Sequence, residues 1–197
     1  EAGVEVVGRT RFCIHGPGVR GIPSVGGTKN WDFEHILRLK PDLLVLDKEE
    51  NPRFMAEQPE IPFHATHVEN LNGMPKALRE LGAILKNSNL EDMAQAFRRL
   101  KKPAGRGLPG VLDWLDRRHY TNAVYIIWKE PWMAASRSTY IGSVLEHCGI
   151  EMLPLEGKYP VIDPAAIFEE TLTIFSSEPF PFCERREGLE VFRGPKC

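Results

Sequence analysis

Apolar and polar residues follow two periods along this chain, and together they indicate a mixed α/β protein. Alternation over Val4–Val7 and the short run Arg11–Ile14 predict two strands near the start. The continuous apolar run Leu43–Leu46 is typical of a parallel strand that is buried on both faces. Further strands are predicted over residues 61–68, 123–127 and 172–175.

Helical periodicity separates these strands. Phe33, Ile36 and Leu37 form an apolar stripe, with Asn30 or Asp32 as the N-cap residue. Pro52 stands where a helix would begin, since proline suits the first helical position. Further helices are predicted over residues 75–86, 90–102, 111–118, 139–148 and 164–170.

Strands and helices alternate twice, and this order predicts two parallel α/β lobes. We expect an N-terminal α/β lobe over residues 1–88, a helical bridge over residues 89–120 and a C-terminal α/β lobe over residues 121–197. Prolines and glycines at 103, 105, 107, 109 and 110 interrupt the bridge, so we expect a kink or two helices there.

Composition excludes several classes of protein. The 197 residues carry 25 basic and 27 acidic side chains, a near-balance that argues against general nucleic-acid binding and against adhesion to anionic lipid. No apolar run approaches the roughly 20 residues that a membrane-spanning helix needs. A hydrophobic fraction of 42% excludes a wholly disordered chain. We therefore expect a globular protein without a membrane span.

Aromatic and polar side chains cluster directly after three predicted strands. These turns are Asp47–Asn51, Trp128–Met133 and Ser176–Phe182. Ligands of parallel sheets bind beyond the carboxyl ends of the strands, so the turns are candidate ligand sites. Trp128 and Trp132 flank a proline and offer flat faces to a bulky, partly apolar ligand. The alternative is that either tryptophan anchors the core.

Metal and catalytic motifs are sparse. Cys13 and His15 stand two apart on a predicted strand, so a thiolate and an imidazole share one side and form a candidate metal pair, with a structural role as the alternative. His64 and His67, three apart on a predicted strand, point to opposite faces. No phosphate-loop or nucleophile motif is complete. We predict no catalytic residues, and the protein is not expected to be an enzyme.

The chain resembles the substrate-binding proteins of cobalamin and iron–siderophore ABC importers, and within them the helical-backbone metal receptors. Seven segments carry the resemblance, in the family's order: Val7–His15, Val25–Asn30, Leu39–Val45, Lys48–Asn51, Ile127–Met133, Lys158–Pro160 and Ser176–Phe182. The resemblance implies two α/β lobes joined by a helical bridge, as in class III periplasmic binding proteins. It also implies a metal chelate, such as a corrinoid (cobalamin), haem or a ferric siderophore, held between the lobes.

The resemblance also implies the site residues and the partners. Residues at the matching positions are Asn30, Lys48, Asn51, Trp128, Trp132, Tyr159 and Glu178. Tyr159 falls where cobalamin binders place an aromatic residue, whereas Asp47 replaces a second one. The implied partners are an ABC permease and its ATPase, met by acidic residues on each lobe, and the implied location is the periplasm or an extracellular lipid anchor.

Two departures leave alternatives open. The family's first strand and helix, and its last strand and helix, have no counterpart here, so we expect the usual terminal elements to be lacking. No signal segment opens the sequence, which favours the cytoplasm, although a mature exported chain has also lost its signal. One alternative is direct transition-metal binding through Cys13 and His15. The other is a cytosolic enzyme or interaction protein that reuses the lobe fold.

Overall fold

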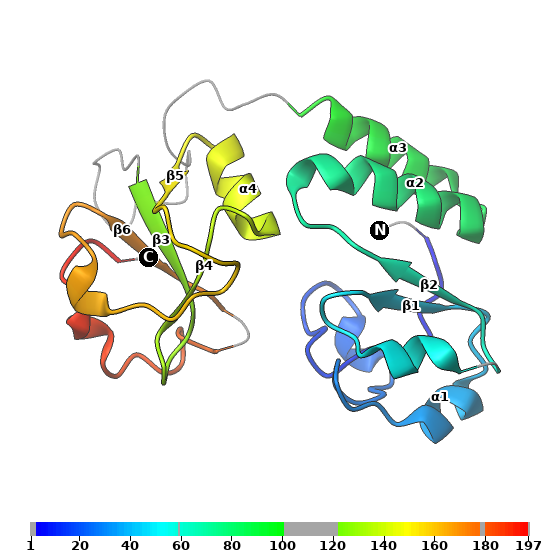
Figure 1. Cartoon of the computed structure of the whole chain (residues 1–197). Helices are drawn as coiled ribbons and strands as arrows, with labels where there is room; N and C mark the ends of the chain where they lie inside the picture. Colours follow the sequence, from blue (N-terminus) through cyan, green and yellow to red (C-terminus); the bar gives the residue numbers. More distant parts are fainter. Residues whose placement is uncertain (1–2, 59, 101–121, 178–179, 197) are drawn as a thin grey trace. The chain divides into compact units, whose positions relative to one another are not determined.

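The computed structural model describes all residues except 1–2, 59, 101–121, 178–179 and 197 (Figure 1). The chain forms two compact units. Unit 1 comprises Glu1–Val68 and Gly73–Arg98, and unit 2 comprises Glu69–Asn72 and Arg99–Cys197. The predicted helix over residues 111–118 and the interrupting prolines and glycines lie outside the described residues.

Unit 1 begins with irregular backbone, so the strands predicted at Val4–Val7 and Arg11–Ile14 are wrong. The backbone of Arg9 pairs only in an isolated bridge with Ser24. The Nε of Arg9 donates to the backbone oxygens of Val19 at 2.8 Å and Ile22 at 3.1 Å, and so holds the loop that follows. Only isolated bridges and the short 3-10 helix η1 (Val19–Gly21) form in this part of the described chain.

The predicted first helix is confirmed as α1 (Phe33–Leu39). Asp32 is its N-cap, and its Oδ1 accepts a 2.9 Å hydrogen bond from the backbone nitrogen of His35. Lys40 ends the helix in the left-handed conformation, with φ 51°.

Strands β1 (Leu44–Asp47) and β2 (Phe63–Thr66) pair in parallel, from Leu44 opposite Phe63 to Asp47 opposite Thr66. The prediction that β1 is buried on both faces is wrong. Leu46 is 8% exposed, whereas Val45, whose side chain points to the opposite face of the strand, is 53% exposed. Between the strands lies the 3-10 helix η2 (Arg53–Glu57), which follows Pro52 where a helix was expected.

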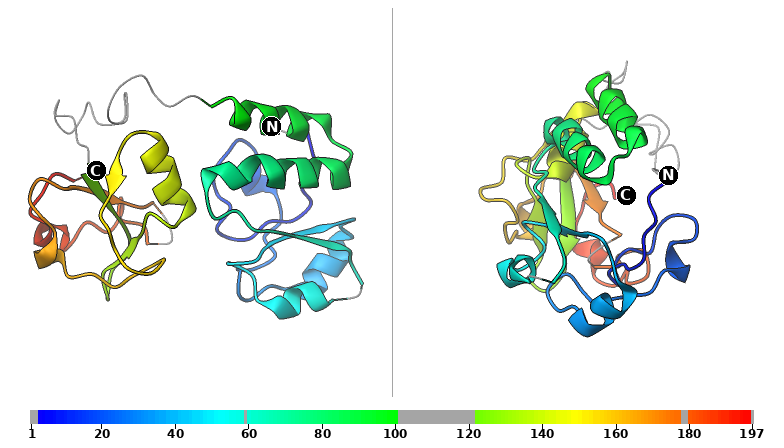
Figure 2. Two further views of the ribbon diagram at one scale, coloured as in Figure 1. Left: turned by 45° about the horizontal axis from the view of Figure 1, so that its top comes forward. Right: turned by 90° about the vertical axis from the view of Figure 1, so that its right-hand side faces the viewer.

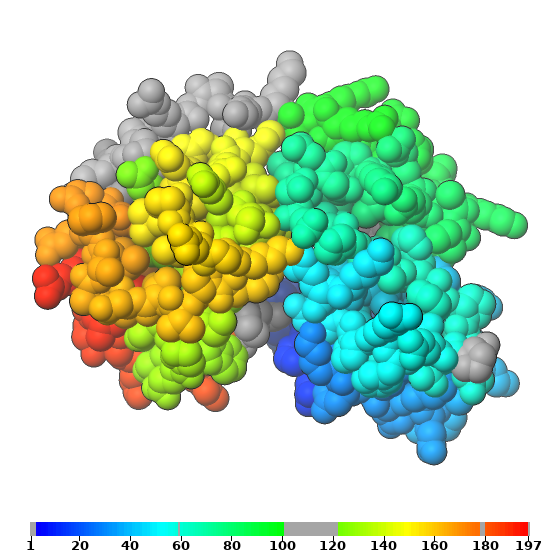
Figure 3. Space-filling model, viewed as in Figure 1, coloured from blue at the N-terminus to red at the C-terminus, as the bar shows by residue number. Residues whose placement is uncertain are grey.

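Two packed helices complete unit 1. The 3-10 helix η3 (Leu71–Gly73) leads into α2 (Met74–Leu85), and α3 (Ser88–Arg98) packs against α2. Ala94 is fully buried, and the space-filling view shows atoms of α2 and α3 side by side on the face in view (Figure 3). Both views in Figure 2 place this pair on one side of β1 and β2 and α1 on the other. α3, expected at the start of the bridge, belongs to unit 1.

The sheet of unit 2 is built around β3 (Asn122–Trp128). β6 (Leu172–Phe175) pairs in parallel along one edge of β3. The other edge takes β5 (Glu151–Met152) in parallel and then β4 (Met133–Ala135) in antiparallel orientation. β3 and β6 were predicted, whereas β4 and β5 are too short to give a periodic signal.

Alternate residues of β3 supply two separate cores. Ala123 packs with Leu145 of α4 (Tyr140–His147), whose N-cap Thr139 accepts from the backbone nitrogen of Gly142 at 3.1 Å. Val124 and its neighbours pack against the C-terminal segment. That second core comprises Val124, Ile126, Ala134, Ile167, Phe182 and Phe192. The helix predicted over residues 164–170 is reduced to the 3-10 turn η4 (Pro164–Ala166), and η5 (Leu189–Val191) precedes Phe192.

Candidate functional site

The turn from β3 to β4 carries both predicted tryptophans, and the structure gives them different environments. The pairing of β3 with β4 shifts register between Ile126 and Trp128. A shift of this kind, as in a β-bulge, changes the direction of the side chains that follow it. Trp128 remains 39% exposed. Its ring meets the edge of Phe180, with ring centroids 5.6 Å apart at 82°. The carboxyl ends of β3 and β6 thus share an aromatic surface.

Trp132 instead packs against the core of unit 2. Its ring stacks on Phe182 at 6.1 Å and 11°, and meets the edge of Phe192 at 5.0 Å. It is half-buried and belongs with the second core. Trp132 therefore fits the alternative role of a core anchor, whereas the more exposed Trp128 fits it less well.

Lys129 holds the β3–β4 turn in place and was missed by the sequence reasoning. Its Nζ donates to the backbone oxygen of Glu187 at 2.8 Å and lies 5.9 Å from the centroid of the Trp132 ring. The side chain is only 21% exposed. A lysine between two tryptophans in a strand-end turn could have been noted as a candidate functional residue. Its hydrogen-bond acceptor lies 58 residues away, however, and could not be inferred from the sequence.

Tyr159 lies on an extended segment that runs beside β4. The backbone nitrogen of Ser136 donates to the oxygen of Lys158, and the nitrogen of Ile162 donates to the oxygen of Trp132. Tyr159 and Val161 are 45% and 63% exposed, so this segment brings an aromatic and an aliphatic side chain to the surface.

The strand-end turn of unit 1 is tied together by hydrogen bonds. Asp47 accepts through Oδ1 from the backbone nitrogen of Glu49 at 2.9 Å, and through Oδ2 from the Thr66 hydroxyl at 3.1 Å. The Asn51 amide oxygen accepts from the Asp47 nitrogen at 2.8 Å, and its nitrogen donates to the oxygen of Thr28 at 2.9 Å. The strand-end turn and the loop that contains Thr28 are therefore connected.

The remaining predicted residues of unit 1 are exposed around that surface. Lys48 is fixed through its backbone nitrogen, which donates to the oxygen of Thr66 at 2.9 Å, so its side chain extends from a rigid position. Asn30 accepts through Oδ1 from Arg11 at 3.1 Å. Lys29, which was not predicted, donates to the oxygen of Glu49 at 3.1 Å. Glu178 lies outside the described residues.

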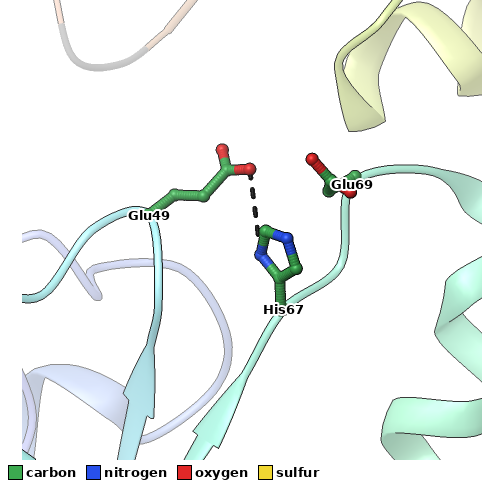
Figure 4. A group of neighbouring side chains, drawn as sticks. All are labelled: Glu49, His67 and Glu69. Atoms are coloured by element: carbon green, nitrogen blue, oxygen red, sulfur yellow. Dashed lines mark ion pairs between the residues drawn. The ribbon is translucent and has the colours of Figure 1, made fainter.

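The structure does not support the metal pair Cys13 and His15. Both are exposed, on irregular backbone instead of a strand, and the Sγ of Cys13 lies 3.3 Å from the hydroxyl of Thr10. Among the described residues, no third metal-ligating side chain joins them. At the ends of β1 and β2, the Nδ1 of His67 lies 3.9 Å from the Oε1 of Glu49 (Figure 4). The rule that ligands bind beyond strand ends could have found this pair.

The fold is that of the periplasmic substrate-binding proteins of ABC importers, as the resemblance predicted. The similar structures include the periplasmic vitamin B12-binding protein BtuF of Vibrio cholerae, at 17% identity and TM-score 0.64, covering 95% of this chain and 74% of that one. A periplasmic haem-binding protein of Pseudomonas aeruginosa has 19% identity and TM-score 0.71, covering 96% and 71%. An ABC transporter substrate-binding protein of Listeria monocytogenes has 14% identity and TM-score 0.62, covering 97% and 73%.

No protein-family model matches the chain, and no curated protein matches it. The similar structures are binding proteins by name, not enzymes. Within the described part of the chain, no helix has the length and apolar character that crossing a bilayer requires.

Proposed function

We propose that this chain is the substrate-binding component of an ABC importer, and that it captures a metal chelate: a corrinoid, haem or a ferric siderophore. The observation that carries the proposal is the exposed ring of Trp128, which lies edge-on to the half-buried Phe180 at the carboxyl ends of β3 and β6. In a fold shared with vitamin B12- and haem-binding proteins, the ligand site is expected at strand ends.

The chemistry of the exposed residues suits such a ligand. Corrin and porphyrin rings are large and flat, and they gain affinity from contact area and from offset or edge-on stacking with aromatic side chains. Trp128 and Tyr159 would supply this area. Lys48 and Asn30 carry a charge and an amide on rigid backbone, and they suit the carboxylates or amides at a chelate's periphery. Catalytic groups have no part in this role.

Partners and location follow from the same role. The proposed partners are an ABC permease and its ATPase, and the proposed location is the periplasm or the outer surface of a membrane, through a lipid anchor. Exposed carboxylates are available on both units for contact with a basic permease surface. Examples are Glu57, which pairs with Arg53 at 3.1 Å, and Glu169, which lies 4.0 Å from Arg193.

Equilibrium titration of the full chain with haem, cobalamin and a ferric siderophore tests the proposal. The absorption band of the ligand is the readout, because replacing a tryptophan would remove a fluorescence probe. We expect one ligand per chain for one of the three classes, and a loss of affinity of at least about tenfold in Trp128→Ala. That loss corresponds to about 1.4 kcal/mol of binding free energy, which is within the range expected for one aromatic contact together with the apolar area that it buries.

Phe168→Ala is the matched control. Phe168 is the most exposed of the described large hydrophobic side chains, at 72%, and it precedes β6, at the amino ends of the strands. Its removal should leave the affinity unchanged. If no class of chelate binds, or if both variants lose affinity equally, the proposal is wrong.

A further inference from the structure

The ring of Phe180 supports a cation next to the exposed Trp128. The guanidinium carbon of Arg185 lies over the Phe180 ring, 5.7 Å from its centroid. The same ring lies 5.6 Å from the Trp128 ring, at an interplanar angle of 82°. All three residues belong to unit 2, and both Trp128 and Arg185 are exposed. An indole and a guanidinium that solvent can reach are therefore supported by one phenyl ring.

The chain around Phe180 holds this arrangement from two sides. The half-buried Phe180 ring lies 4.5 Å from the ring of Phe182, which is 2% exposed and part of the second core. The backbone nitrogens of Glu184 and Arg185 each donate to the oxygen of Pro181 at 3.0 Å. The chain thus turns directly after Phe180, and this turn brings Arg185 back to the Phe180 ring.

A guanidinium in this position is suited to bind a carboxylate. The contact with the Phe180 ring draws on its charge and takes none of its five N–H donors as a hydrogen bond. The planar fork of arginine matches a carboxylate through two parallel N–H···O bonds. A corrin or porphyrin ring is wider than either ring distance given above, so a ligand that stacks on Trp128 can bring its peripheral groups to Arg185.

We propose that the chelate bound by this chain carries carboxylates, and that Arg185 binds one of them. This inference rests on the proposed function, because it concerns the ligand of the same surface. Haem, with its two propionates, and ferric siderophores of the carboxylate class meet the requirement. The corrin ring of cobalamin carries amides instead. An amide accepts through one neutral oxygen, so it gains less from a guanidinium than a carboxylate does.

The experiment is an equilibrium dialysis of the full chain against two pairs of ligands and cobalamin, with metal content as the readout. Each pair contrasts a carboxylate ligand with a similar one that lacks free carboxylates. The pairs are haem with its dimethyl ester, and the carboxylate siderophore ferric rhizoferrin with the neutral hydroxamate ferrichrome. We expect the carboxylate member of one pair to bind more tightly than its counterpart and than cobalamin. Which pair responds distinguishes a haem from a siderophore.

Substitutions separate the charge from the contact area. Arg185→Gln should lower the affinity for the carboxylate member at least about tenfold and change that for its counterpart little, since a hydrogen bond to a charged group is lost only with the first. Arg185→Lys keeps the charge without the fork and should fall between the two. Trp128→Ala should weaken both members alike. Arg193→Gln is the matched control, because it removes a 73% exposed arginine of unit 2 that lies 4.0 Å from Glu169, and it should change neither affinity.

The inference is overturned if cobalamin or a ligand without carboxylates binds most tightly. It is also overturned if Arg185→Gln weakens both members of a pair equally, because Arg185 would then only support the Phe180 ring, or if Arg193→Gln has as large an effect. Tight cobalamin binding that Trp128→Ala abolishes would contradict this inference and leave the proposed function standing, whereas binding of no chelate would contradict both. Thermal unfolding of the free variants checks that each chain is folded.

Discussion

The side-chain amide of Asn51 donates a 2.9 Å hydrogen bond to the backbone oxygen of Thr28, and this bond joins two loops that are 23 residues apart in sequence. The oxygen of the same amide accepts from the backbone nitrogen of Asp47 at 2.8 Å. Both polar ends of Asn51 thus bind protein groups. Its first role is to position the strand-end turn that carries Lys48 and Glu49.

Replacing Asn51 should therefore cost stability. Asn51→Ala leaves the nitrogen of Asp47 and the oxygen of Thr28 without these partners, and should lower the free energy of unfolding by about 1–3 kcal/mol. Lys48→Ala removes only an exposed side chain and should change it by less than about 0.5 kcal/mol. Urea unfolding followed by circular dichroism measures both. Equal stability of the two variants would contradict the positioning role.

Elements that depend on neighbours in sequence were predictable. α1 has its cap three residues before the nitrogen that it binds, and β3 and β6 are buried strands with a continuous apolar pattern. The strand-end turns followed from these elements, because a turn at the carboxyl end of a parallel strand is where ligands bind. The exposed Trp128 was found in this way, whereas the exposed Tyr159 was predicted from the family resemblance.

Elements that depend on distant partners were not predictable. Arg9 donates to carbonyls at residues 19 and 22, 10 and 13 residues further along the chain, and so holds a loop that no local pattern indicates. Val45 has the apolar character of a buried residue, but its exposure depends on which elements cover its face of the sheet. Trp132 is drawn into the core by Phe182 and Phe192, about 50 and 60 residues later. Local pattern carries no information about any of these partners.

The two tryptophans should respond differently to truncation. Trp132→Ala removes a half-buried ring that contacts Phe182 and Phe192, and should lower the free energy of unfolding by about 3 kcal/mol. Trp128→Ala removes a 39% exposed ring that meets the edge of Phe180, and should cost about 1 kcal/mol or less. Thermal and urea unfolding measure the difference. If Trp128→Ala is the more damaging substitution, the assignment of core and surface roles is wrong.

Lys129 should control the local stability of the C-terminal segment. Lys129→Met keeps the aliphatic stem against Trp132 but leaves the backbone oxygen of Glu187 without its 2.8 Å donor. We expect a loss of about 1 kcal/mol and faster hydrogen exchange over residues 187–192. Glu130→Gln is the control. The Glu130 carboxylate is 84% exposed and lies 4.0 Å from the Nζ of Lys129, and such an exposed ion pair contributes little to stability. Faster exchange in both variants would mean that the ion pair, not the hydrogen bond, holds the segment.

The described thiols should react in a definite order. Cys13 and Cys183 are exposed and Cys148 is half-buried at the end of α4, where burial raises the pKa of its thiol. The thiolate is the reactive form, so a raised pKa means less thiolate at neutral pH and slower alkylation. Cys148 should therefore label last with N-ethylmaleimide, and its rate should keep rising to a higher pH than that of a free model thiol. Peptide mass spectrometry over a pH series measures both effects, and labelling of Cys148 as fast as Cys183 at neutral pH would contradict them. Because the thiol is shielded by the fold, mild urea should remove the difference before the exposed thiols change their rate.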